Sequence, residues 1–435
     1  MTTTTASLPA SQERALLITL AAVQFANVLD FMIMMPLGAK IMGVFAITPR
    51  EFSWLVAAYG TAAAISGFAG GFVLDRFDRR NALLVLFSGF TLATFACAIA
   101  PTYLALLFAR LAAGAFGGVA GSVVTAMVGD VIPPERRGRA MSTVMSAFPL
   151  ASIAGVPLSI ILANAWEWHA PFYLLTVLSL IVLFIAARTL PHVPSQRGDH
   201  TGWRQMRAIL VHPVHQRGFW LGGLLMFAGA AIVPFMAPSL IKNVGISESQ
   251  LPFIYLVGGT ASFFAMPWLG RMSDRYDKLH VLMVVTLPAC LAVLVLTHLG
   301  PTPLPLVLPL SAFFFVGMAS RFPPAMAMIT NSVEARYRGG FMSVISAIQQ
   351  AAAGLANVAS GLLVTADADG RLIGFNRAGF MSVTAFAFTV WMAWRLRVIA
   401  PYAARNPHER EVATASPPSG GPAANTTYRT PDDAP

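Results

Sequence analysis

The apolar positions of this chain fall in runs of roughly 20 residues, and short charged segments separate the runs. A helix needs about that length to cross the ~30 Å hydrocarbon core of a bilayer. A strand of a membrane barrel would instead be about ten residues long, with alternating hydrophobicity. We therefore predict an all-α membrane protein with twelve transmembrane helices, over 15–38, 52–74, 81–100, 103–127, 140–163, 169–188, 218–240, 251–271, 279–299, 305–329, 341–364 and 377–396.

The composition agrees with a chain that is buried in lipid. Hydrophobic residues make up 56% of the chain and charged residues only 11%, whereas a soluble domain carries about 25% charged residues. The net charge of +10 is compatible with nucleic-acid binding. However, the basic residues flank the apolar runs and form no stripe interleaved with aromatic residues, so we expect no nucleic-acid partner.

The basic residues also predict the orientation of the chain in the membrane. With both termini in the cytoplasm, 22 of the 29 Lys and Arg lie on the cytoplasmic side, five on the other side, and Arg110 and Arg321 lie inside helices. This is the asymmetry that the positive-inside rule describes. Three lysines against 26 arginines are typical of a G+C-rich bacterium. We expect a multi-pass protein of a bacterial cytoplasmic (inner) membrane.

The two halves of the sequence repeat each other. The run from Gly71 to Arg80 recurs from Gly270 to Leu279, displaced by 199 residues, and RGRAMS recurs as RGGFMS, displaced by 201. Paired membrane halves are typical of secondary transporters. We predict two pseudo-symmetric six-helix bundles in this order: a cytoplasmic N-terminal segment (1–14), the N-terminal bundle (15–188), a cytoplasmic central loop (189–217), the C-terminal bundle (218–397) and a cytoplasmic, largely disordered tail (398–435).

The motif after the second predicted helix, Gly71-x-x-x-Asp75-Arg76-x-x-Arg79-Arg80, resembles the loop motif of the major facilitator superfamily. The resemblance covers about residues 15–396 and points to the twelve-helix bacterial drug and sugar exporters, the drug:proton antiporter-1-like subclass. It departs at Asp78, where the family has a second glycine. The resemblance implies that these residues and their repeat (Gly270, Asp274 and Arg275) latch a cytoplasmic gate. The alternative is that the arginines only anchor the topology.

Two ionisable residues stand inside predicted helices and need partners. Arg110 begins a pattern, Arg110-x-x-x-Gly114-x-x-Gly117-Gly118, that resembles the family's arginine-bearing fourth helix. An ionised group deep in a membrane costs at least ~2.5–3.5 kcal/mol, so it persists when it is paired or faces water. Asp30 is the only acidic residue well inside a predicted span, at a depth similar to that of Arg110. We expect Asp30 and Arg110 to pair.

The face of the first predicted helix that carries Asp30 also carries Gln24 and Asn27, at intervals of three residues. A conformational change that moves Arg110 away from Asp30 would let the carboxyl take up a proton, because a nearby cation favours the ionised form. We therefore expect proton coupling at this pair. Two alternatives remain, a fixed structural ion pair and direct contact of Asp30 with a cationic substrate.

We assign Gln24, Asn27, Met34 and Arg321 to a substrate cavity. Methionine and aromatic side chains on the first and seventh helices suit loosely specified apolar ligands, although the same residues also pack or face lipid. Arg321 is expected either to snorkel to the interface or to pair with a loop carboxylate.

The fifth predicted helix carries Gly155 and Pro157, which look like a loosened form of the glycine- and proline-rich motif of the exporters in this superfamily. The alternative is a helix kink with no bearing on transport direction. The leading hypothesis is proton-coupled export of a small molecule, such as a drug-like amphiphile, sugar or metabolite, by alternating access. The alternatives are an uptake symporter of the same fold and a membrane receptor or sensor.

The sequence carries no glycine-rich lysine loop for a nucleotide, no H-E-x-x-H and no cysteine cluster. We therefore expect no cofactor, no metal and no enzymatic activity. The expected partners are the substrate, protons and the lipid bilayer, with the chain acting as a monomer.

Overall fold

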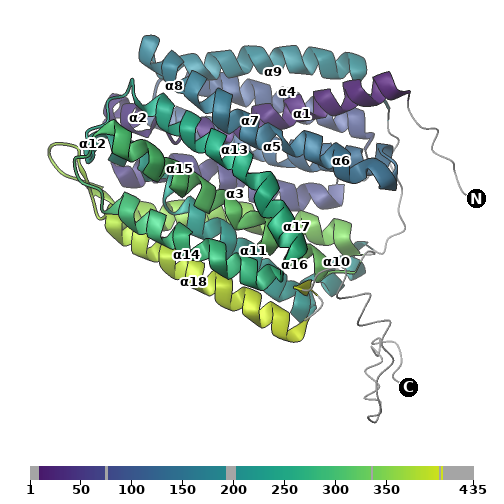
Figure 1. Cartoon of the computed structure of the whole chain (residues 1–435). Helices are drawn as coiled ribbons and strands as arrows, with labels where there is room; N and C mark the ends of the chain where they lie inside the picture. Colours follow the sequence, from purple (N-terminus) through teal and green to yellow (C-terminus); the bar gives the residue numbers. More distant parts are fainter. Residues whose placement is uncertain (1–8, 74–76, 193–201, 335–336, 401–402, 405–435) are drawn as a thin grey trace, which may run out of the picture.

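The computed structural model describes residues 9–73, 77–192, 202–334, 337–400 and 403–404. In this part of the chain the fold is helical apart from one short hairpin (Figure 1). The elements of the first half are α1 (Ala10–Ile33), α2 (Gly38–Phe45), α3 (Pro49–Val73), α4 (Arg79–Ala98), α5 (Tyr103–Val131), α6 (Pro134–Met145), α7 (Ala147–Leu150), the π-helical turn η2 (Ala151–Gly155), α8 (Val156–Ala165) and α9 (Ala170–Thr189).

The second half follows a short helix, α10 (Gly202–Val211), in the segment predicted as the central loop. Its elements are α11 (Pro213–Ala230), α12 (Val233–Lys242), α13 (Leu251–Arg275), α14 (Lys278–Thr297), α15 (Leu304–Ser320), α16 (Phe322–Asn331), α17 (Arg338–Leu363), the strands β1 (Thr365–Ala366) and β2 (Leu372–Ile373), and α18 (Phe375–Ile399). We call α1–α9 the N-half and α11–α18 the C-half.

The described part of the chain contains eleven segments that are long and apolar enough to cross a membrane. The 25-residue helix α18 packs along α11 and α14 as the twelfth. Large apolar side chains point away from the protein in the middle of the helices, for example Leu92 on α4 and Leu287 on α14, which are 69% and 76% exposed. Lipid, and not water, is the solvent that such a surface suits. The predicted twelve-helix membrane fold is confirmed.

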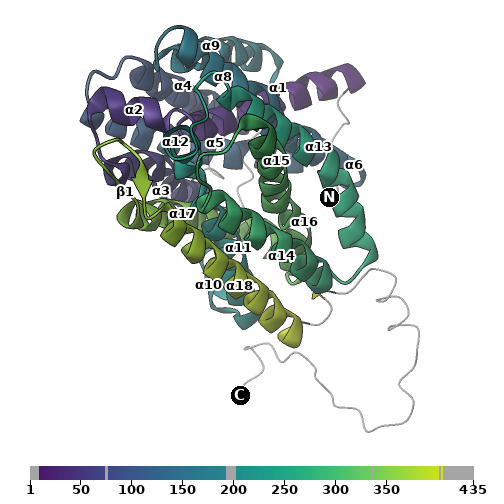
Figure 2. The same ribbon diagram turned by 60° about the vertical axis from the view of Figure 1, so that its left-hand side comes forward.

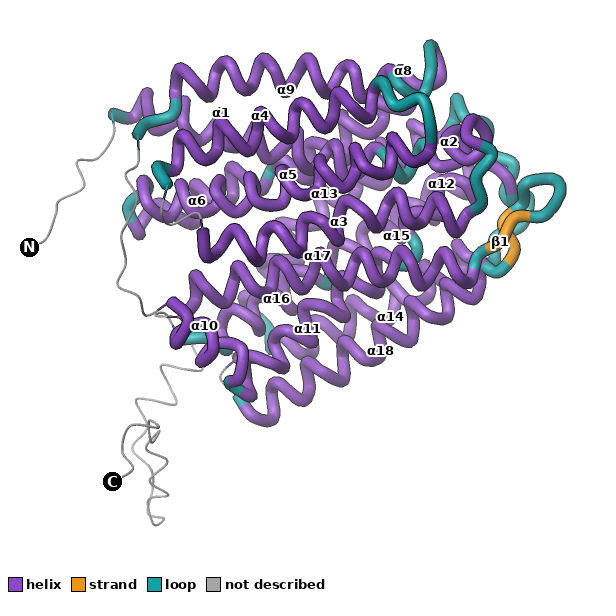
Figure 3. The backbone as a smooth tube through the Cα atoms, turned by 180° about the vertical axis from the view of Figure 1, so that it is seen from behind, coloured by secondary structure: helices purple, strands orange, loops and turns teal. Residues whose placement is uncertain are grey.

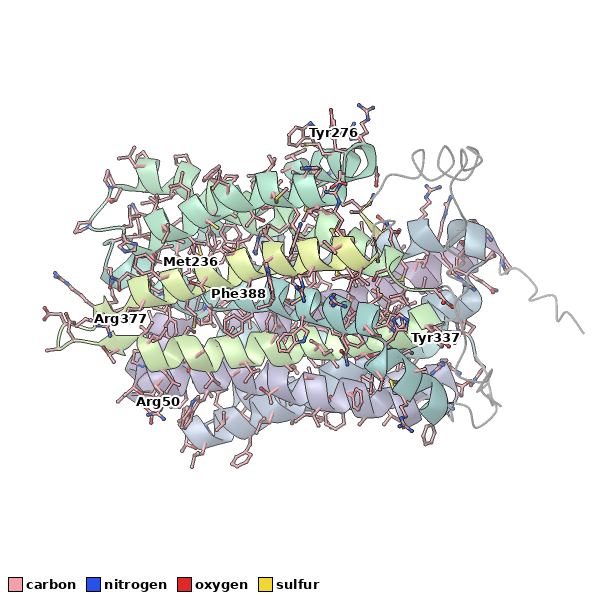
Figure 4. The ribbon with its side chains drawn as sticks, turned by 90° about the horizontal axis from the view of Figure 1, so that it is seen from below. Arg50, Met236, Tyr276, Tyr337, Arg377 and Phe388 are labelled. Carbon is pink, nitrogen blue, oxygen red and sulfur yellow. The ribbon has the colours of Figure 1, made fainter. Side chains whose placement is uncertain are left out.

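The loops gather at the two ends of the helix bundle. One end holds α2, α12 and the β1–β2 hairpin, and we call it the hairpin end; α1 begins and α18 finishes at the opposite, terminal end (Figure 3). The five basic residues that were predicted to lie apart from the others belong to segments of the hairpin end, namely Lys40, Arg50, Lys242, Arg371 and Arg377. Arg50 and Arg377 lie at one end of the molecule in Figure 4, and Tyr276 and Tyr337 lie at the other.

Four of the predicted helices are not continuous, and proline lies at each break. The first predicted helix turns at 34–37, which includes Pro36, and resumes as α2. The fifth passes through η2 just before Pro157, since the proline ring clashes with the carbonyl four residues earlier and removes a hydrogen bond. The seventh and tenth restart as α12 and α16, each with proline in its first turn. The predicted continuity was wrong because it was based on hydrophobicity alone.

The two halves contact each other through small residues. Helix α17 lies beside α3 (Figure 2), and α13 packs on α8 and η2. A Cβ added to Gly354 on α17 would lie 2.6 Å from Thr61 Oγ1 on α3. At Gly361 it would collide with Ser53. Glycine at these positions therefore lets the two helix backbones approach closely, as is common between membrane helices.

Candidate functional site

The centre of the N-half contains an ion pair that is closed off from solvent. The Asp30 carboxylate on α1 accepts a hydrogen bond from Arg110 Nη1 on α5, with 2.7 Å between Oδ2 and the nitrogen. The same nitrogen also donates to the Asp30 carbonyl oxygen at 3.1 Å. Both side chains are 0% exposed. The structure thus brings together the two residues that were expected to pair, and it places them within one half.

Two further helices complete the surroundings of this pair. Thr94 on α4 donates a hydrogen bond from Oγ1 to Asp30 Oδ1 at 3.4 Å. The Arg110 guanidinium lies over the Tyr59 ring of α3, 4.7 Å from its centroid. Arg110 Nε and Nη2 have no hydrogen-bonding partner among the oxygen and nitrogen atoms of the described residues. Two of the three guanidinium nitrogens of Arg110 therefore remain free to donate hydrogen bonds.

The glycines of α5 hold Tyr59 in place. A Cβ at Gly114 would collide with the Tyr59 backbone, and at Gly117 it would lie 2.6 Å from the Tyr59 hydroxyl. At Gly118 it would lie 2.6 Å from Ala63 Cα. These contacts press α3 against α5, and the Tyr59 ring then lies beneath the guanidinium of Arg110. The glycine pattern in the fourth predicted helix therefore provides close helix packing.

The other residues predicted on α1 are less exposed than a cavity lining would require. Asn27 is 6% exposed and Met34 is 0% exposed, while Gln24 is half-buried. The side-chain oxygens of Gln24 and Asn27 and the amide nitrogen of Asn27 have no hydrogen-bonding partner among the described residues. Buried amides without partners are costly unless water or a ligand meets them. Their role in a cavity stays a prediction.

Arg321 lies at the junction of α15 and α16 and is 1% exposed. Its guanidinium lies over the Phe386 ring of α18, 4.0 Å from the centroid. It forms no ion pair with a carboxylate among the described residues. The expectation that it snorkels to the interface was wrong, because the break in the helix leaves the side chain inside the C-half. Pairing with a loop carboxylate is not seen among the described residues and stays a prediction.

At the terminal end, Arg79 and Arg80 of the first loop motif form hydrogen bonds with residues of the N-half and of the segment that follows it. Arg79 Nε donates to Asp130 Oδ2 on α5 at 3.1 Å. Arg80 hydrogen bonds with His192 and donates to the Ala187 carbonyl at 2.6 Å. Sequence reasoning missed Asp130, although an acid at the last turn of a membrane helix facing a basic loop was a usable signal. The predicted residues Asp75 and Arg76, and the surroundings of Gly71, lie outside the described residues.

Asp78 replaces the family's second glycine and caps α4, because its Oδ1 accepts from Asn81 N at 3.0 Å. Asp277, displaced by 199 residues, caps α14 in the same way and also pairs with Arg397 at 3.1 Å. In both repeats the aspartate therefore starts the next helix.

The other predicted residues of the second loop motif are more open. A Cβ at Gly270 would meet nothing within 4 Å. Asp274 and Arg275 are exposed. Asp274 forms no hydrogen bond or ion pair with the described residues. No latching contact of Asp274 is therefore seen among the described residues, and a gating role for this motif stays a prediction.

The helix-5 motif lies between the halves. A Cβ at Gly155 would lie 2.7 Å from Leu29 Cδ1, next to Asp30 on α1. On the other side of η2, Ser152 and Ile153 face Gly259 of α13, where a Cβ would lie 3.2 Å and 3.1 Å from their side chains. A π-helical turn often marks a functional site in a helix. This one touches both the helix that carries Asp30 and the opposite half.

Three residues join the halves at the hairpin end. Lys40 Nζ of α2 lies 3.1 Å from Glu248 Oε2 and donates to the Ala163 carbonyl at 2.7 Å. Asn164 Nδ2 donates to the Glu248 carbonyl at 2.8 Å. We call Lys40, Asn164 and Glu248 the hairpin-end clasp. Sequence reasoning missed it because Glu248 stands in a short loop with no motif around it.

The described residues contain no group of three or more His, Cys, Asp or Glu that could hold a metal ion. Two six-helix halves around buried charges are the architecture of secondary transporters. A family model described as Major Facilitator Superfamily matches residues 20–356 and 219–428. The chain belongs to this superfamily, whose members are transporters and not enzymes.

Relatives and solved structures agree with this membership. The chain is 29% identical over 176 residues to the uncharacterized MFS-type transporter YceJ of Bacillus subtilis, covering 40% of this chain and 45% of the relative. It is 26% identical over 242 residues to a chloramphenicol resistance protein of Streptomyces lividans, covering 53% and 62%. The matches thus span about half the length of these relatives.

A crystal structure of a bacterial homolog of the human lysosomal transporter Spinster, in an inward-facing and unoccupied conformation, superposes with a TM-score of 0.71. It is 15% identical and covers 92% of this chain and 100% of that chain. At this identity the similarity establishes the fold alone.

Proposed function

We propose that the chain is a secondary transporter that exports a small molecule in exchange for protons, by alternating access of its two halves. The observation that carries the proposal is the sealed Asp30–Arg110 pair within a two-half transporter fold. The similarity to a chloramphenicol resistance protein supports export of a drug-like or other small compound. We assign the chain to a bacterial cytoplasmic membrane, as a monomer with both termini in the cytoplasm.

The proton step follows from the geometry of the pair. A carboxylate that faces a guanidinium at 2.7 Å is stabilised in its ionised form. A movement of α1 against α5 would separate the two groups, and a carboxyl left without its cation in a low-dielectric interior then favours the protonated form. Arg110 would keep the Tyr59 ring as its remaining partner. Proton uptake and helix movement are thereby linked.

The described conformation is closed at the hairpin end. The hairpin-end clasp joins the two halves there, and Phe52 of α3 contacts Phe235 of α12 with ring centroids 6.4 Å apart. The hairpin end carries few basic residues, so the positive-inside rule places it outside the cell. We interpret this conformation as the one that is closed to the outside.

The π-helical turn η2 connects the proton site to the movement of the halves. Gly155 contacts α1 one residue away from Asp30, while Ser152 and Ile153 contact α13 of the opposite half. A shift of η2 against α13 would therefore change the packing around Leu29 and the position of the neighbouring Asp30 carboxylate. This position favours a coupling role for the motif over a kink without function.

Proton movement in liposomes tests the proposal. The purified full chain is reconstituted with a pH-sensitive dye inside, and candidate compounds are added from outside. Wild type should move protons in response to a transported compound, and Asp30→Asn should not. The matched control is Glu167→Gln, because Glu167 is 78% exposed on a loop. Proton movement in the Asp30→Asn variant equal to wild type would show that the pair is only structural.

Vesicles of known orientation separate export from uptake. Inside-out vesicles with an acidic interior should accumulate the substrate if the chain is an exporter. An uptake symporter would instead deplete it from the same vesicles. A receptor or sensor would produce no gradient-dependent movement in either orientation.

A further inference from the structure

Arg321 is a buried cation that the proton-coupling mechanism does not use. Its hydrogen bonds go to its own helix, from Nε to the Gly317 carbonyl at 3.3 Å and from Nη2 to the Met318 carbonyl at 3.4 Å. Nη2 also contacts Met318 Sδ at 3.0 Å. Nη1 has no partner among the described residues. These long bonds to neutral acceptors leave most of the donor capacity of a guanidinium unused.

The Phe386 ring compensates the charge of Arg321 only in part. The guanidinium carbon lies 4.0 Å from the ring centroid, and the ring is 0% exposed. A cation–π contact of this kind attracts a cation, but it supplies no negative charge. A buried charge normally persists in a protein when it is paired, and a lone one is strongly unfavourable. An anion that reaches Arg321 would therefore be held tightly.

The N-half shows what is missing around Arg321. The two loop motifs are 199 residues apart, and at the same spacing the position that corresponds to Asp30 in the C-half is Gly229 of α11. A Cβ at Gly229 would lie 3.7 Å from Arg321 Nη2 and 3.7 Å from Met318 Sδ. Where the N-half has a carboxylate facing its guanidinium, the C-half therefore has a glycine facing its own.

Two broken helices meet at this point. Arg321 stands at the break between α15 and α16, and Gly229 lies just before the break between α11 and α12. Helix α11 packs against α16. Paired interruptions of this kind in transporter helices mark substrate sites near the middle of the membrane. The half-buried side chains of Phe227 and Met318 adjoin the same position and offer an apolar surface.

We propose that Arg321 binds the carboxylate of the transported compound, and that Gly229 leaves the room for it. The substrate class is a small organic monoanion with an apolar or aromatic body. A planar carboxylate can accept from Nη1 and Nη2 together, which is the geometry that a guanidinium favours. This inference rests on the proposed transport function and narrows its substrate.

Binding to the purified full chain in detergent tests the inference without a proton gradient. The probes are benzoate, phenylacetate and 4-phenylbutyrate, each compared with its uncharged amide, and the readout is the ligand-dependent shift of the thermal unfolding midpoint. Carboxylates should raise the midpoint of wild type, and amides should not. Arg321→Met should weaken carboxylate binding by about tenfold to a hundredfold, the range expected for loss of hydrogen bonds to a charged group.

A second variant keeps the test informative if Arg321→Met folds poorly. Gly229→Asp gives the guanidinium an internal carboxylate, so carboxylate probes should lose their effect on a protein that still folds. The matched control is Arg271→Met, since Arg271 is exposed on α13 and should leave binding unchanged. Equal stabilisation by carboxylates and amides, or carboxylate binding that survives in both variants, overturns the inference.

The same measurement separates this inference from the proposed function. Asp30→Asn should still bind carboxylates, because Asp30 lies in the other half. If wild type binds carboxylates but shows no proton-driven transport, the proposed function is refuted and the site at Arg321 still stands.

Discussion

In the part of the chain that the structure describes, one arginine in each half is almost completely buried, Arg110 in the N-half and Arg321 in the C-half, and their surroundings differ. Arg110 in the N-half has a carboxylate at 2.7 Å, a threonine beside that carboxylate and a tyrosine ring beneath the guanidinium. Arg321 in the C-half has a phenylalanine ring and carbonyl oxygens of its own helix. Two halves that repeat each other in their loop motifs thus differ in whether the interior charge is neutralised.

The difference indicates a division of labour. A paired guanidinium and carboxylate can respond to a proton, because the pair changes its charge when the carboxyl is protonated. An unpaired guanidinium can respond to an anion, because its counter-charge is missing. We infer that the N-half handles the proton and the C-half the substrate. Single-residue changes in the two halves should therefore have effects of different size and kind.

Replacing each buried arginine by methionine should give the largest difference in stability between a variant of the N-half and a variant of the C-half. Arg110→Met leaves the buried Asp30 without its counter-ion and should lower the free energy of unfolding by about 3–5 kcal/mol. Arg321→Met removes a charge that has no counter-ion, so it should be neutral or stabilising. Thermal unfolding in detergent, with the double variant Asp30→Asn/Arg110→Met recovering part of the loss, provides the measurement. Equal losses in the two single variants would contradict the comparison.

The glycine face of α5 should be the next most sensitive feature. In Gly114→Ala the added methyl group collides with the backbone of Tyr59, so the variant should lose about 1–3 kcal/mol through overpacking. Gly129→Ala on the same helix is the control, since a Cβ there meets nothing within 4 Å. It should be neutral or gain up to about 1 kcal/mol from helix propensity. The thermal unfolding midpoints of both variants provide the measurement. Equal midpoints would show that the close contact of α5 with α3 at Gly114 does not contribute to stability.

The hairpin-end clasp should contribute least to stability. Lys40 and Glu248 are 24% and 45% exposed, and partly exposed ion pairs contribute about 0–1 kcal/mol. Lys40→Ala should therefore change the unfolding midpoint little. Its effect should appear in accessibility, because a cysteine introduced beside the clasp would react faster with a membrane-impermeant thiol reagent. An unchanged reaction rate would exclude the clasp as a closing contact.

The sequence predicted the paired site better than the unpaired one. Asp30 and Arg110 could be matched because helical spacing gives the face and residue count gives the depth. The environment of Arg321 could not be predicted, since the helix breaks at Arg321 itself and the depth of the side chain can then no longer be counted from the end of a continuous helix. The contacts of Asp130 and Glu248 depend on how helix ends meet in space, which hydrophobic patterning does not report.

The backbone of the fifth segment shows a similar limit. Its apolar run predicted one helix over 140–163, whereas the chain has a π-helical turn at Ala151–Gly155. The proline at 157 signalled a disturbance. Its consequence depends on Leu29 and Gly259, which lie far away in the sequence and fit against the turn.

Paired transport assays of Asp30→Asn show whether the Asp30 carboxyl carries the coupling proton, as proposed. Liposomes containing wild type or the variant are measured for substrate exchange without a pH gradient and for accumulation with one. Asp30→Asn should still exchange substrate but no longer accumulate it. Accumulation by the variant at the wild-type level would show that Asp30 does not carry the coupling proton.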